Sequence, residues 1–366
     1  MLHAGIIGLP NVGKSTLFNA MTESDVVSGN YMFSTLEPNV GRVFLNDPRL
    51  DVLRKMVQSK KCVPTTVEFI DIPGLVSGSS KGEGIGNQFL ATIREVDAIC
   101  QVIRCFEDDN VLHVDNSLDP LRDILTIQLE LNYADLDSVS KRLGRMEKKI
   151  KTSPTSDEKL EFLTLKKIEE ALYNDIPIRL LDLTDDEKRV IKSYNFLSQK
   201  PMLYVANVSE DDIVDLDNSE FYQQVLNQGI KDQCPVFPIS AKLEHELIRL
   251  DEEEKREFME ELGLKESALD GFIRIAYDTL GLQTYFTNGV QETRAWTFKK
   301  GMTARECAGI IHSDFERGFI RAETVSYDDL LKYGSHQAAK EAGKVRLEGK
   351  DYIVKDGDVM LFRFNV

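Results

Sequence analysis

A nine-residue stretch near the N-terminus, GLPNVGKST (Gly8 to Thr16), constrains the fold of this 366-residue sequence more than any other feature. It fits the pattern G-x-x-x-x-G-K-[ST], and it lies between a short apolar run and a predicted helix from Ser15 to Thr22. The two glycines allow the backbone to wrap round a phosphate, so that N–H groups and the helix N-terminus face the anion. The alternative is a chance match in a glycine-rich turn. The flanking strand and helix favour a phosphate site.

Each residue of this loop has an expected part in nucleotide binding. Lys14 is expected to reach the β- and γ-phosphates, and the Ser15 hydroxyl to ligate Mg²⁺. Asn11 offers an amide oxygen that suits K⁺, and a purely structural role is its alternative. The predicted nucleotide-binding residues of the loop are Asn11, Val12, Gly13, Lys14, Ser15 and Thr16.

Strand-like runs alternate with helical patterns over most of the chain. The predicted strands are Ala4–Gly8, Arg42–Leu45, Thr66–Asp71, Ala98–Arg104, Met202–Val208 and Val236–Ile239. This alternation predicts an α/β fold with a doubly wound, mostly parallel sheet that binds its ligand at the carboxyl ends of the strands.

Two further segments supply candidates for the magnesium shell and for hydrolysis. Asp71 ends a strand where such proteins hold Mg²⁺ through water, and the N–H of Gly74 is placed to sense the γ-phosphate. Thr35 is expected to close on Mg²⁺ from a first switch loop, or else to be a turn hydroxyl. Metal ligation is thus assigned to Ser15, Thr35 and Asp71, with Lys14 and Gly74 in catalytic roles.

The position after Gly74 lacks the glutamine that orients water in many related nucleotidases. Leu75 stands there, and an apolar side chain cannot polarise water. Hydrolysis is therefore expected to be slow or to be assisted by another group, a cation or a partner. His113 is a candidate for that group, because neutral imidazole accepts a proton near pH 7; a loop histidine without chemistry is the alternative. The glycine-rich segment Val76–Phe89 is predicted to be a mobile second switch.

The base site departs from the Asn-Lys-x-Asp pattern that reads guanine. The predicted base contacts are Asn207, Val208, Ser209 and Glu210, followed by Ser240, Ala241 and Lys242. Val208 replaces the lysine that covers the base, and Glu210 is one methylene longer than the aspartate that accepts from guanine. Adenine lacks those two donors, and Asn207 can serve adenine N7 and N6. The sequence predicts ATP as the nucleotide, with GTP as the alternative.

The alternation is interrupted once, which suggests an inserted helical arm. From Leu136 the apolar residues step by three and four, and a second helical pattern places Leu160, Leu163, Ile168 and Leu172 on one face. The predicted domains are residues 1–135 and 201–281 for the nucleotide-binding domain, 136–200 for an antiparallel helical arm, and 282–366 for a small α+β domain. In the last of these, QETRAWTFKKGMTARECAGIIHSDF predicts a strand, a turn and a helix, and GKDYIVKDGDVMLFRFNV predicts an antiparallel hairpin.

Charge and composition limit the partners. A net charge of −16 argues against indiscriminate nucleic-acid binding and against DNA as a partner. No apolar run reaches the length of a membrane span. The N-terminus does not resemble a secretory signal, so a cytoplasmic location is expected. The five scattered cysteines are expected to be buried thiols rather than disulfides or zinc ligands.

A basic stretch in the arm is the exception to this acidity. It contains Lys141, Arg142, Arg145, Lys148, Lys149 and Lys151. Together with Lys299, Lys300, Arg317 and Arg321 it is interpreted as flanking a groove for structured RNA, with a solvated helix surface as the alternative. Trp296 and Phe298 are expected to be core residues rather than stacking platforms.

These motifs together resemble the YchF subfamily of Obg-related P-loop proteins. The resemblance covers essentially the whole chain and is carried by GLPNVGKST, DIPGL, KGEGIGNQF, NVSE, the helical arm and the C-terminal GKDYIVKDGDVMLFRFNV. It implies a G domain, a coiled-coil arm, a ubiquitin-like TGS domain, hydrolysis of ATP to ADP and phosphate, and association with ribosomes. Family members also lack the glutamine and have a histidine in the loop of His113. Met32 departs from the family's usual proline, while Thr35 is kept.

The function expected from this resemblance is an Mg²⁺-dependent ATPase switch that acts with the ribosome in translation or stress regulation. Two alternatives remain at this point: a GTPase of the Obg class, and a nucleotide-gated ribosome-binding protein whose hydrolysis is incidental. No base for an acceptor hydroxyl is evident, which argues against a phosphotransferase.

Overall fold

The computed structural model describes residues 2–24, 39–73, 84–108, 117–152, 154–264 and 267–365. By its internal contacts the chain forms two compact units. Unit 1 comprises residues 1–42 and 68–279, and unit 2 comprises residues 43–67 and 280–366. Residues 43–67 were expected to belong to the nucleotide-binding domain, but they belong to unit 2. The predicted first segment, residues 1–135, is therefore divided between the two units. The limits of the arm stay a prediction.

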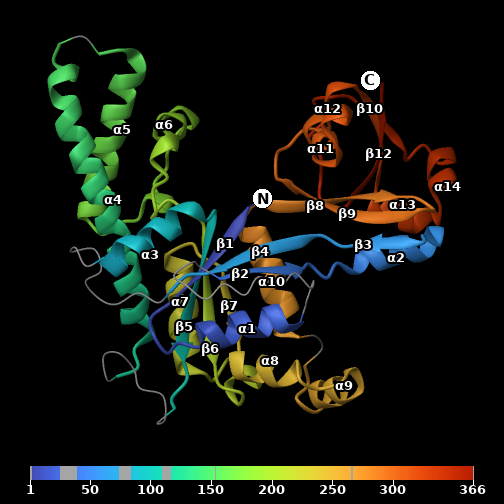
Figure 1. Ribbon diagram of the computed structural model, residues 1–366, viewed down its shortest axis with the longest axis horizontal. Coiled ribbons are helices and arrows are strands. Elements are labelled where there is room, and N and C mark those ends of the chain that lie inside the picture. The colour runs from blue at the N-terminus through green and yellow to red at the C-terminus, as the bar shows by residue number, and fades with distance from the viewer. Residues whose placement is uncertain are drawn as a thin grey trace. The chain divides into compact units, whose positions relative to one another are not determined.

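Unit 1 is built on a six-stranded sheet with the order β2-β4-β1-β5-β6-β7 (Figure 1). Its strands are β1 His3–Ile7, β2 Asn39–Phe44, β4 Thr66–Asp71, β5 Ala98–Cys105, β6 Met202–Val208 and β7 Val236–Ile239. The pairings of β1 with β4 and β5, of β5 with β6 and of β6 with β7 are all parallel. The doubly wound parallel sheet predicted from the sequence is confirmed, and every predicted strand is present with ends shifted by three residues at most.

Helices cover this sheet. They are α1 Lys14–Ser24, α3 Gly84–Glu95, α4 Pro120–Ile150, α7 Glu220–Lys231, α8 Ala241–Leu247, α9 Glu252–Glu261 and α10 Ala268–Thr279. Helix α4 packs against β5, and α7 against β6 and β7, while α1 packs against β1 and α10 against β7. Because α3 begins at Gly84, the last six residues of the predicted second switch are helical rather than loop.

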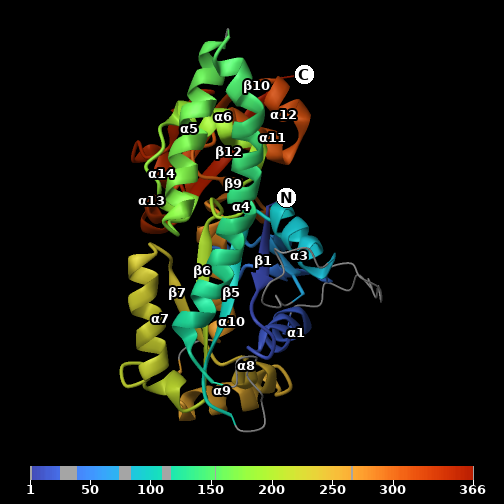
Figure 2. The ribbon, with the colours of Figure 1, turned by 90° about the vertical axis from the view of Figure 1, so that its left-hand side faces the viewer.

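The helical arm is formed by the outer part of α4 and by α5 Ser156–Tyr173, which run antiparallel (Figures 1 and 2). The predicted seam of α4 is confirmed, because Val139, Leu143 and Met146 are buried against α5. On α5 the predicted Ile168 and Leu172 are buried and Leu160 is partly buried, but Leu165 is buried as well and Leu163 is 65% exposed. The prediction that Leu163 faces the core was therefore wrong.

A short return segment closes the arm and joins it to β6. It contains the 3-10 turns Ile178–Leu180 and Lys192–Tyr194 and the helix α6 Asp185–Ile191. At its end, the buried carboxylate of Asp135 accepts hydrogen bonds from the backbone N–H groups of Leu197 (3.0 Å) and Ser198 (2.7 Å) and from the Ser198 hydroxyl (2.7 Å). Lys200 then donates to the carbonyl oxygens of Arg94 and Val96 at the end of α3. These bonds fasten the base of the arm to unit 1.

Unit 2 is an α+β structure with a mixed six-stranded sheet of order β11-β10-β12-β8-β9-β3. Its strands are β3 Lys61–Val63, β8 Leu282–Asn288, β9 Glu292–Lys299, β10 Phe319–Ser326, β11 Arg346–Glu348 and β12 Asp358–Phe364. Its helices are α2 Pro48–Val57, α11 Ala304–Ile311, α12 Ser313–Arg317, α13 Tyr327–Tyr333 and α14 His336–Glu341. The α+β class and the strand, turn and helix of residues 291–315 are confirmed.

Both faces of this second sheet are covered. Tyr285 packs in a cluster with Cys307 of α11, whereas the next residue, Phe286, packs with Leu53 of α2 on the other face. Helix α2 and strand β3 belong to residues 43–67, so the second face of the C-terminal sheet is covered in part by a segment that precedes it by more than two hundred residues. Alternation along β8 supplies a side chain to each layer.

The C-terminal hairpin prediction was wrong. Strand β12 pairs antiparallel with β10 and parallel with β8, and the residues before it form only an isolated bridge between Ile353 and Thr303. The Lys-Asp-Gly turn is present, with Gly357 at φ 81°, but it leads the chain into the middle of a sheet rather than back along itself. Phe298 is buried and Trp296 partly buried against the same core, as expected.

The cysteines fit their expected role in four of five cases. Cys100, Cys105, Cys234 and Cys307 are buried free thiols, and Cys62 is partly buried. Among the described residues, no helix combines the length and the apolar character that crossing a membrane requires.

Candidate nucleotide-binding site

The predicted phosphate loop lies between the end of β1 and the start of α1. Asn11 and Gly13 both have positive φ angles, 64° and 91°. This backbone conformation turns successive N–H groups inward, which is the geometry of an anion-binding concavity. A Cβ at Gly8 would lie 2.8 Å from the Val102 carbonyl oxygen, so the loop is also held close against β5. The loop therefore has the shape and the packing of a phosphate cradle.

The lysine of the loop is buried and paired. Lys14 is 9% exposed, and its ammonium forms an ion pair with the carboxylate of Asp71 at the end of β4. A buried ammonium needs such a counter-charge, because the cost of removing it from water is otherwise large. The pair brings together the residue predicted to bind phosphate and the residue predicted to hold the magnesium shell. Ser15, at the second position of α1, is exposed on the same turn.

Asn207 lies at the end of β6, two strands from the phosphate loop, and connects it to the next loop of the site. Its side-chain amide donates to the Val12 carbonyl oxygen (2.8 Å), and its Oδ1 accepts from the backbone N–H of Ala241 (3.0 Å). Asn207 is only 3% exposed. Each bond uses only one of the two N–H groups of Nδ2 and one of the two acceptor sites of Oδ1, so the adenine contacts expected for Asn207 stay a prediction. We assign Asn207 to support of the loop.

The same asparagine explains why position 13 is a glycine. A Cβ built on Gly13 would lie 2.2 Å from Asn207 Nδ2. The backbone conformation and the neighbouring amide thus both exclude a larger residue.

The remaining predicted base contacts are divided between buried and exposed positions. Val208 and Ala241 are buried, and Ser240 caps α8 by accepting from the N–H of Leu243. Glu210 and Lys242 form an ion pair (3.0 Å) in which the side chains are 38% and 72% exposed. The hydroxyl of Ser209 accepts from the N–H of Asp212 (3.0 Å). The carboxylate of Glu210 is thus held toward Lys242.

One residue near the site was not predicted. Arg104, 4% exposed near the end of β5, donates to the carbonyl oxygens of Phe106 (3.0 Å) and Asp108 (3.2 Å), and its guanidinium lies 4.8 Å from the centre of the Phe106 ring. It fixes the start of the loop that leads toward His113. The available signal was a single arginine within an otherwise apolar strand, AICQVIRC.

Three predicted site residues, Thr35, Gly74 and His113, lie outside the described residues, as does Leu75. Their roles stay predictions. Those of Lys14, Ser15 and Asp71 also stay predictions, although these residues come together at one edge of the sheet as expected.

The basic residues of the arm are of two kinds. Three form ion pairs within the arm: Lys141 with Asp137, Arg142 with Glu161, and Lys149 with Glu158. Arg145, Lys148 and Lys151 are exposed and form no ion pair with a described residue. In unit 2, Lys299, Lys300 and Arg321 are exposed, while Arg317 pairs with Asp314. The predicted RNA groove thus depends on fewer free cations than the sequence offered.

The turn, the buried ion pair and the parallel sheet around it define a nucleotide-binding protein of the P-loop class. Two family models match the chain: "50S ribosome-binding GTPase" over residues 3–133, and the YchF-type GTPase C-terminal domain, described as "Protein of unknown function", over residues 282–365.

Full-length relatives identify the family. The chain is 54% identical over 365 residues to "Ribosome-binding ATPase YchF" of Bacillus subtilis, with 100% of both chains covered, and 51% identical over 362 residues to the protein of that name from Escherichia coli O157:H7, with 99% of both covered. The solved structure of the Schizosaccharomyces pombe YchF GTPase matches with a TM-score of 0.86 and 36% identity, covering 99% of this chain and 97% of that one. This chain belongs to the YchF family, and the resemblance predicted from its sequence is confirmed.

Proposed function

We propose that this protein is a ribosome-associated, Mg²⁺-dependent ATPase of the cytoplasm. The observation that carries the proposal is the buried pair of Lys14 and Asp71 beside a turn with two positive φ angles. Support also comes from the relatives, which are named ribosome-binding ATPases and match this chain from end to end.

The residues present fit a nucleotide with its metal. A phosphate beside the loop offers Lys14 a second anionic partner, which frees the carboxylate of Asp71 to accept from water on the metal. The hydroxyl of Ser15 is exposed at the start of α1, where it suits direct ligation. Mg²⁺ supplies neutralisation of the charge that develops on the phosphate oxygens.

Preference for ATP is proposed from what the base site lacks. Guanine reading requires a carboxylate aimed at the base, and Glu210 is instead paired with Lys242. Val208 cannot cover the base as a lysine stem does. Competition of ATP and GTP against a fluorescent nucleotide, each with Mg²⁺ and with EDTA, tests this part. Tighter binding of GTP would refute the ATP assignment, and affinity unchanged by EDTA would refute the role of the metal.

Hydrolysis without the usual glutamine needs a group from elsewhere. We propose that His113 orients the attacking water, because Leu75 stands where related proteins have the glutamine that does so. We also propose that the N–H of Gly74 binds the γ-phosphate. His113→Ala is expected to lower kcat at least 100-fold without changing ATP affinity. A rate that is unaffected would remove His113 from the mechanism, and a rate that depends on K⁺ over Na⁺ would support a K⁺ role for Asn11.

Ribosome association is proposed to use the free cations of the arm. Arg145 and Lys148 lie three residues apart on α4, so they share one face, and Lys151 follows at its end. Such a stripe matches phosphates of structured RNA, with exposed Lys299, Lys300 and Arg321 of the proposed TGS domain as a second contact.

Cosedimentation with ribosomes over a range of salt concentrations tests this contact. The double variant Arg145→Glu, Lys148→Glu is expected to weaken binding at least tenfold and to make it less salt-dependent. The matched control is Lys141→Glu, Asp137→Lys, which reverses an existing ion pair on the same helix without changing the net charge. Equal binding by both variants would assign the contact to another surface.

A further inference from the structure

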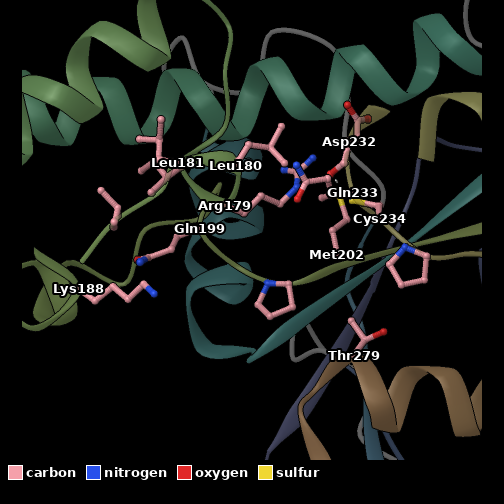
Figure 3. Close-up of a pocket in the computed structure, with 14 residues that line it drawn as sticks. Arg179, Leu180, Leu181, Lys188, Gln199, Met202, Asp232, Gln233, Cys234 and Thr279 are labelled. Atoms are coloured by element: carbon pink, nitrogen blue, oxygen red, sulfur yellow. Dashed lines mark hydrogen bonds between the residues drawn. The ribbon is translucent and has the colours of Figure 1, made fainter. Parts of the chain in front are cut away.

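A cavity of about 440 Å³ lies at the edge of the first sheet opposite the phosphate loop (Figure 3). It is lined by Pro201 and Met202 at the start of β6 and by Pro235 just before β7. Because these strands are parallel, their starts lie at one edge of the sheet and their ends, with Asn207 and Ser240, at the other. The cavity is therefore separate from the nucleotide site.

The other walls come from the segments that attach the arm. Ile178, Arg179, Leu180, Leu181 and Leu183 enter from the arm. Gln199 follows the arm's last turn, and Lys188 projects from α6. The remaining wall is the turn after α7, with Asp232, Gln233 and Cys234, and the end of α10 at Thr279. In Figure 3, Lys188 and Gln199 lie at one end of the cavity, and Arg179 lies between them and the turn of Asp232 and Cys234.

Two cations line this cavity without an anionic partner. Neither Arg179 nor Lys188 forms an ion pair with any residue in the described ranges. The guanidinium of Arg179 donates from Nη2 to Oε1 of Gln128 (3.2 Å) and also hydrogen-bonds the thiol of Cys234, while its buried Nε has no acceptor among the described groups. Both of these partners are neutral, so the charge of the guanidinium is not balanced by them.

The one acidic residue in the wall is already engaged. Asp232 accepts from the hydroxyl of Tyr204 (2.6 Å) and from the amide of Gln228 (3.1 Å to each oxygen). The other groups that face Arg179, the thiol of Cys234 and the phenol of Tyr204, are neutral because burial raises the pKa of each. The cavity thus carries a net positive charge in a protein whose overall charge is −16.

The rest of the lining is apolar. Leu180, Leu181, Leu183 and Met202 supply aliphatic surface next to the two cations. A volume of this size lies within the range of small-molecule sites, and an apolar wall with few placed polar groups is their usual composition. An inorganic anion would leave the aliphatic wall without a partner.

We propose that this cavity binds a small organic carboxylate. Its carboxylate pairs with Arg179, while Lys188 and Gln199 supply a positive charge and an amide donor at the other end of the cavity. Its apolar body, of the size of a substituted benzoate, packs against the leucines and Met202. The guanidinium suits this ligand because its planar set of donors matches the two oxygens of a carboxylate. Since the arm's attachment segments form the walls, a bound ligand holds them together.

The test uses the full-length protein and the probe 4-(trifluoromethyl)benzoate, whose ¹⁹F resonance broadens on binding. Titration is expected to give saturable binding in the millimolar range or tighter. The neutral analogue 4-(trifluoromethyl)benzamide and inorganic phosphate are expected to bind at least tenfold more weakly. ATP with Mg²⁺ is expected not to displace the probe, because the nucleotide site lies at the other edge of the sheet.

Variants connect the signal to the cavity. Arg179→Met is expected to weaken binding of the probe at least tenfold, and Lys188→Met about threefold. Lys192 is an exposed lysine outside the cavity, so Lys192→Met is expected to leave the affinity for the probe unchanged. Lys188 is exposed, so its variant folds even if that of Arg179 does not. No saturable binding, equal binding of the benzamide, displacement by ATP or by equimolar phosphate, or an unchanged affinity in Lys188→Met would each overturn the proposal.

Discussion

Replacement of Asn207 by alanine tests whether this residue supports the phosphate loop or reads the base. The side chain joins two backbone groups that are otherwise distant in sequence, the carbonyl of Val12 and the N–H of Ala241. Both residues are nearly fully buried, at 1% and 2% exposure. Truncation to alanine removes both bonds, and the burial of these positions limits access of water to the two groups left behind.

The magnitude follows from those two groups. A buried donor or acceptor that loses its partner costs about 1–3 kcal/mol, so the two together predict a loss of about 2–6 kcal/mol in the free energy of unfolding. The phosphate loop loses its connection to β6, and nucleotide affinity is expected to fall about 10-fold to 100-fold. Because phosphates are common to both nucleotides, ATP and GTP are expected to lose the same factor.

Urea denaturation and titration with fluorescent ATP and GTP analogues measure the two quantities. Asn207→Asp keeps an acceptor for Ala241 but places a buried carboxylate oxygen against the carbonyl oxygen of Val12, so a loss of stability at least as large as that of the alanine variant is expected. Asn218→Ala, at an exposed position outside the site, is the control. An unchanged urea midpoint in Asn207→Ala, together with a change of more than tenfold in the ratio of ATP to GTP affinity, would show that Asn207 reads the base and would refute the supporting role.

Three further predictions concern the arm. Asp135→Ala leaves two buried backbone N–H groups unpaired and is expected to lower the free energy of unfolding by about 3–5 kcal/mol in urea denaturation. Leu163→Gln is expected to change that free energy by less than about 0.5 kcal/mol, and Leu165→Ala to lower it by about 2–5 kcal/mol, because only the second side chain is buried. Hydrogen bonds from Lys149 and from the backbone of Thr155 lower the pKa of Glu158 from 4.5 to about 2, and this lowered pKa stabilises the folded arm above pH 4.5, an effect lost as the pH falls toward 2. Lys149→Met is expected to raise the pKa of Glu158 toward 4.5 in a carboxyl ¹³C NMR titration. An unchanged pKa would show that the capping bond from Thr155, and not Lys149, lowers the pKa of Glu158.

Local patterns were enough to predict the first sheet. Each of its strands is a short apolar run bounded by a turn or a helix, and its parallel order follows from the alternation with helices. The phosphate loop could be predicted equally well, because its function depends on a backbone conformation that glycines at a fixed spacing allow. The seam of α4 was correct for the same reason: a spacing of three and four residues fixes one face of a helix.

What the sequence did not predict mostly concerns contacts between distant segments. Strand β3 has three residues, Lys61–Val63, and it pairs with β9, which lies more than two hundred residues later in the chain. Apolar and polar residues alternate along β12 as they do in a hairpin strand, but this alternation does not reveal which strand pairs with it. The antiparallel partner of β12 is β10. Leu163 is spaced from Leu160 as residues on neighbouring turns of a helix are, but it lies outside the face of α5 that α4 covers. Asn207 ends a strand as predicted, but only the fold reveals that a backbone carbonyl lies within reach of its amide.

The position of Asn207 also bears on how strongly this site can prefer one purine. With one N–H of its amide bonded to Val12 and one acceptor site of its Oδ1 bonded by Ala241, Asn207 keeps a single N–H for purine N7, which both nucleotides share, and a single acceptor site for adenine N6. Preference for ATP would then arise from loss of the guanine acceptor, because Glu210 is held by an exposed lysine, and from at most one hydrogen bond of Asn207 to adenine N6. Sites that hydrogen-bond a distinguishing group reject its analogue by about 10⁴-fold, whereas a site that merely lacks the partner discriminates far less. We therefore expect the ratio of ATP to GTP affinity in direct competition to lie below about 100. A ratio near 10⁴ would refute this reasoning and would show that adenine meets a full set of matched hydrogen-bonding groups in the site.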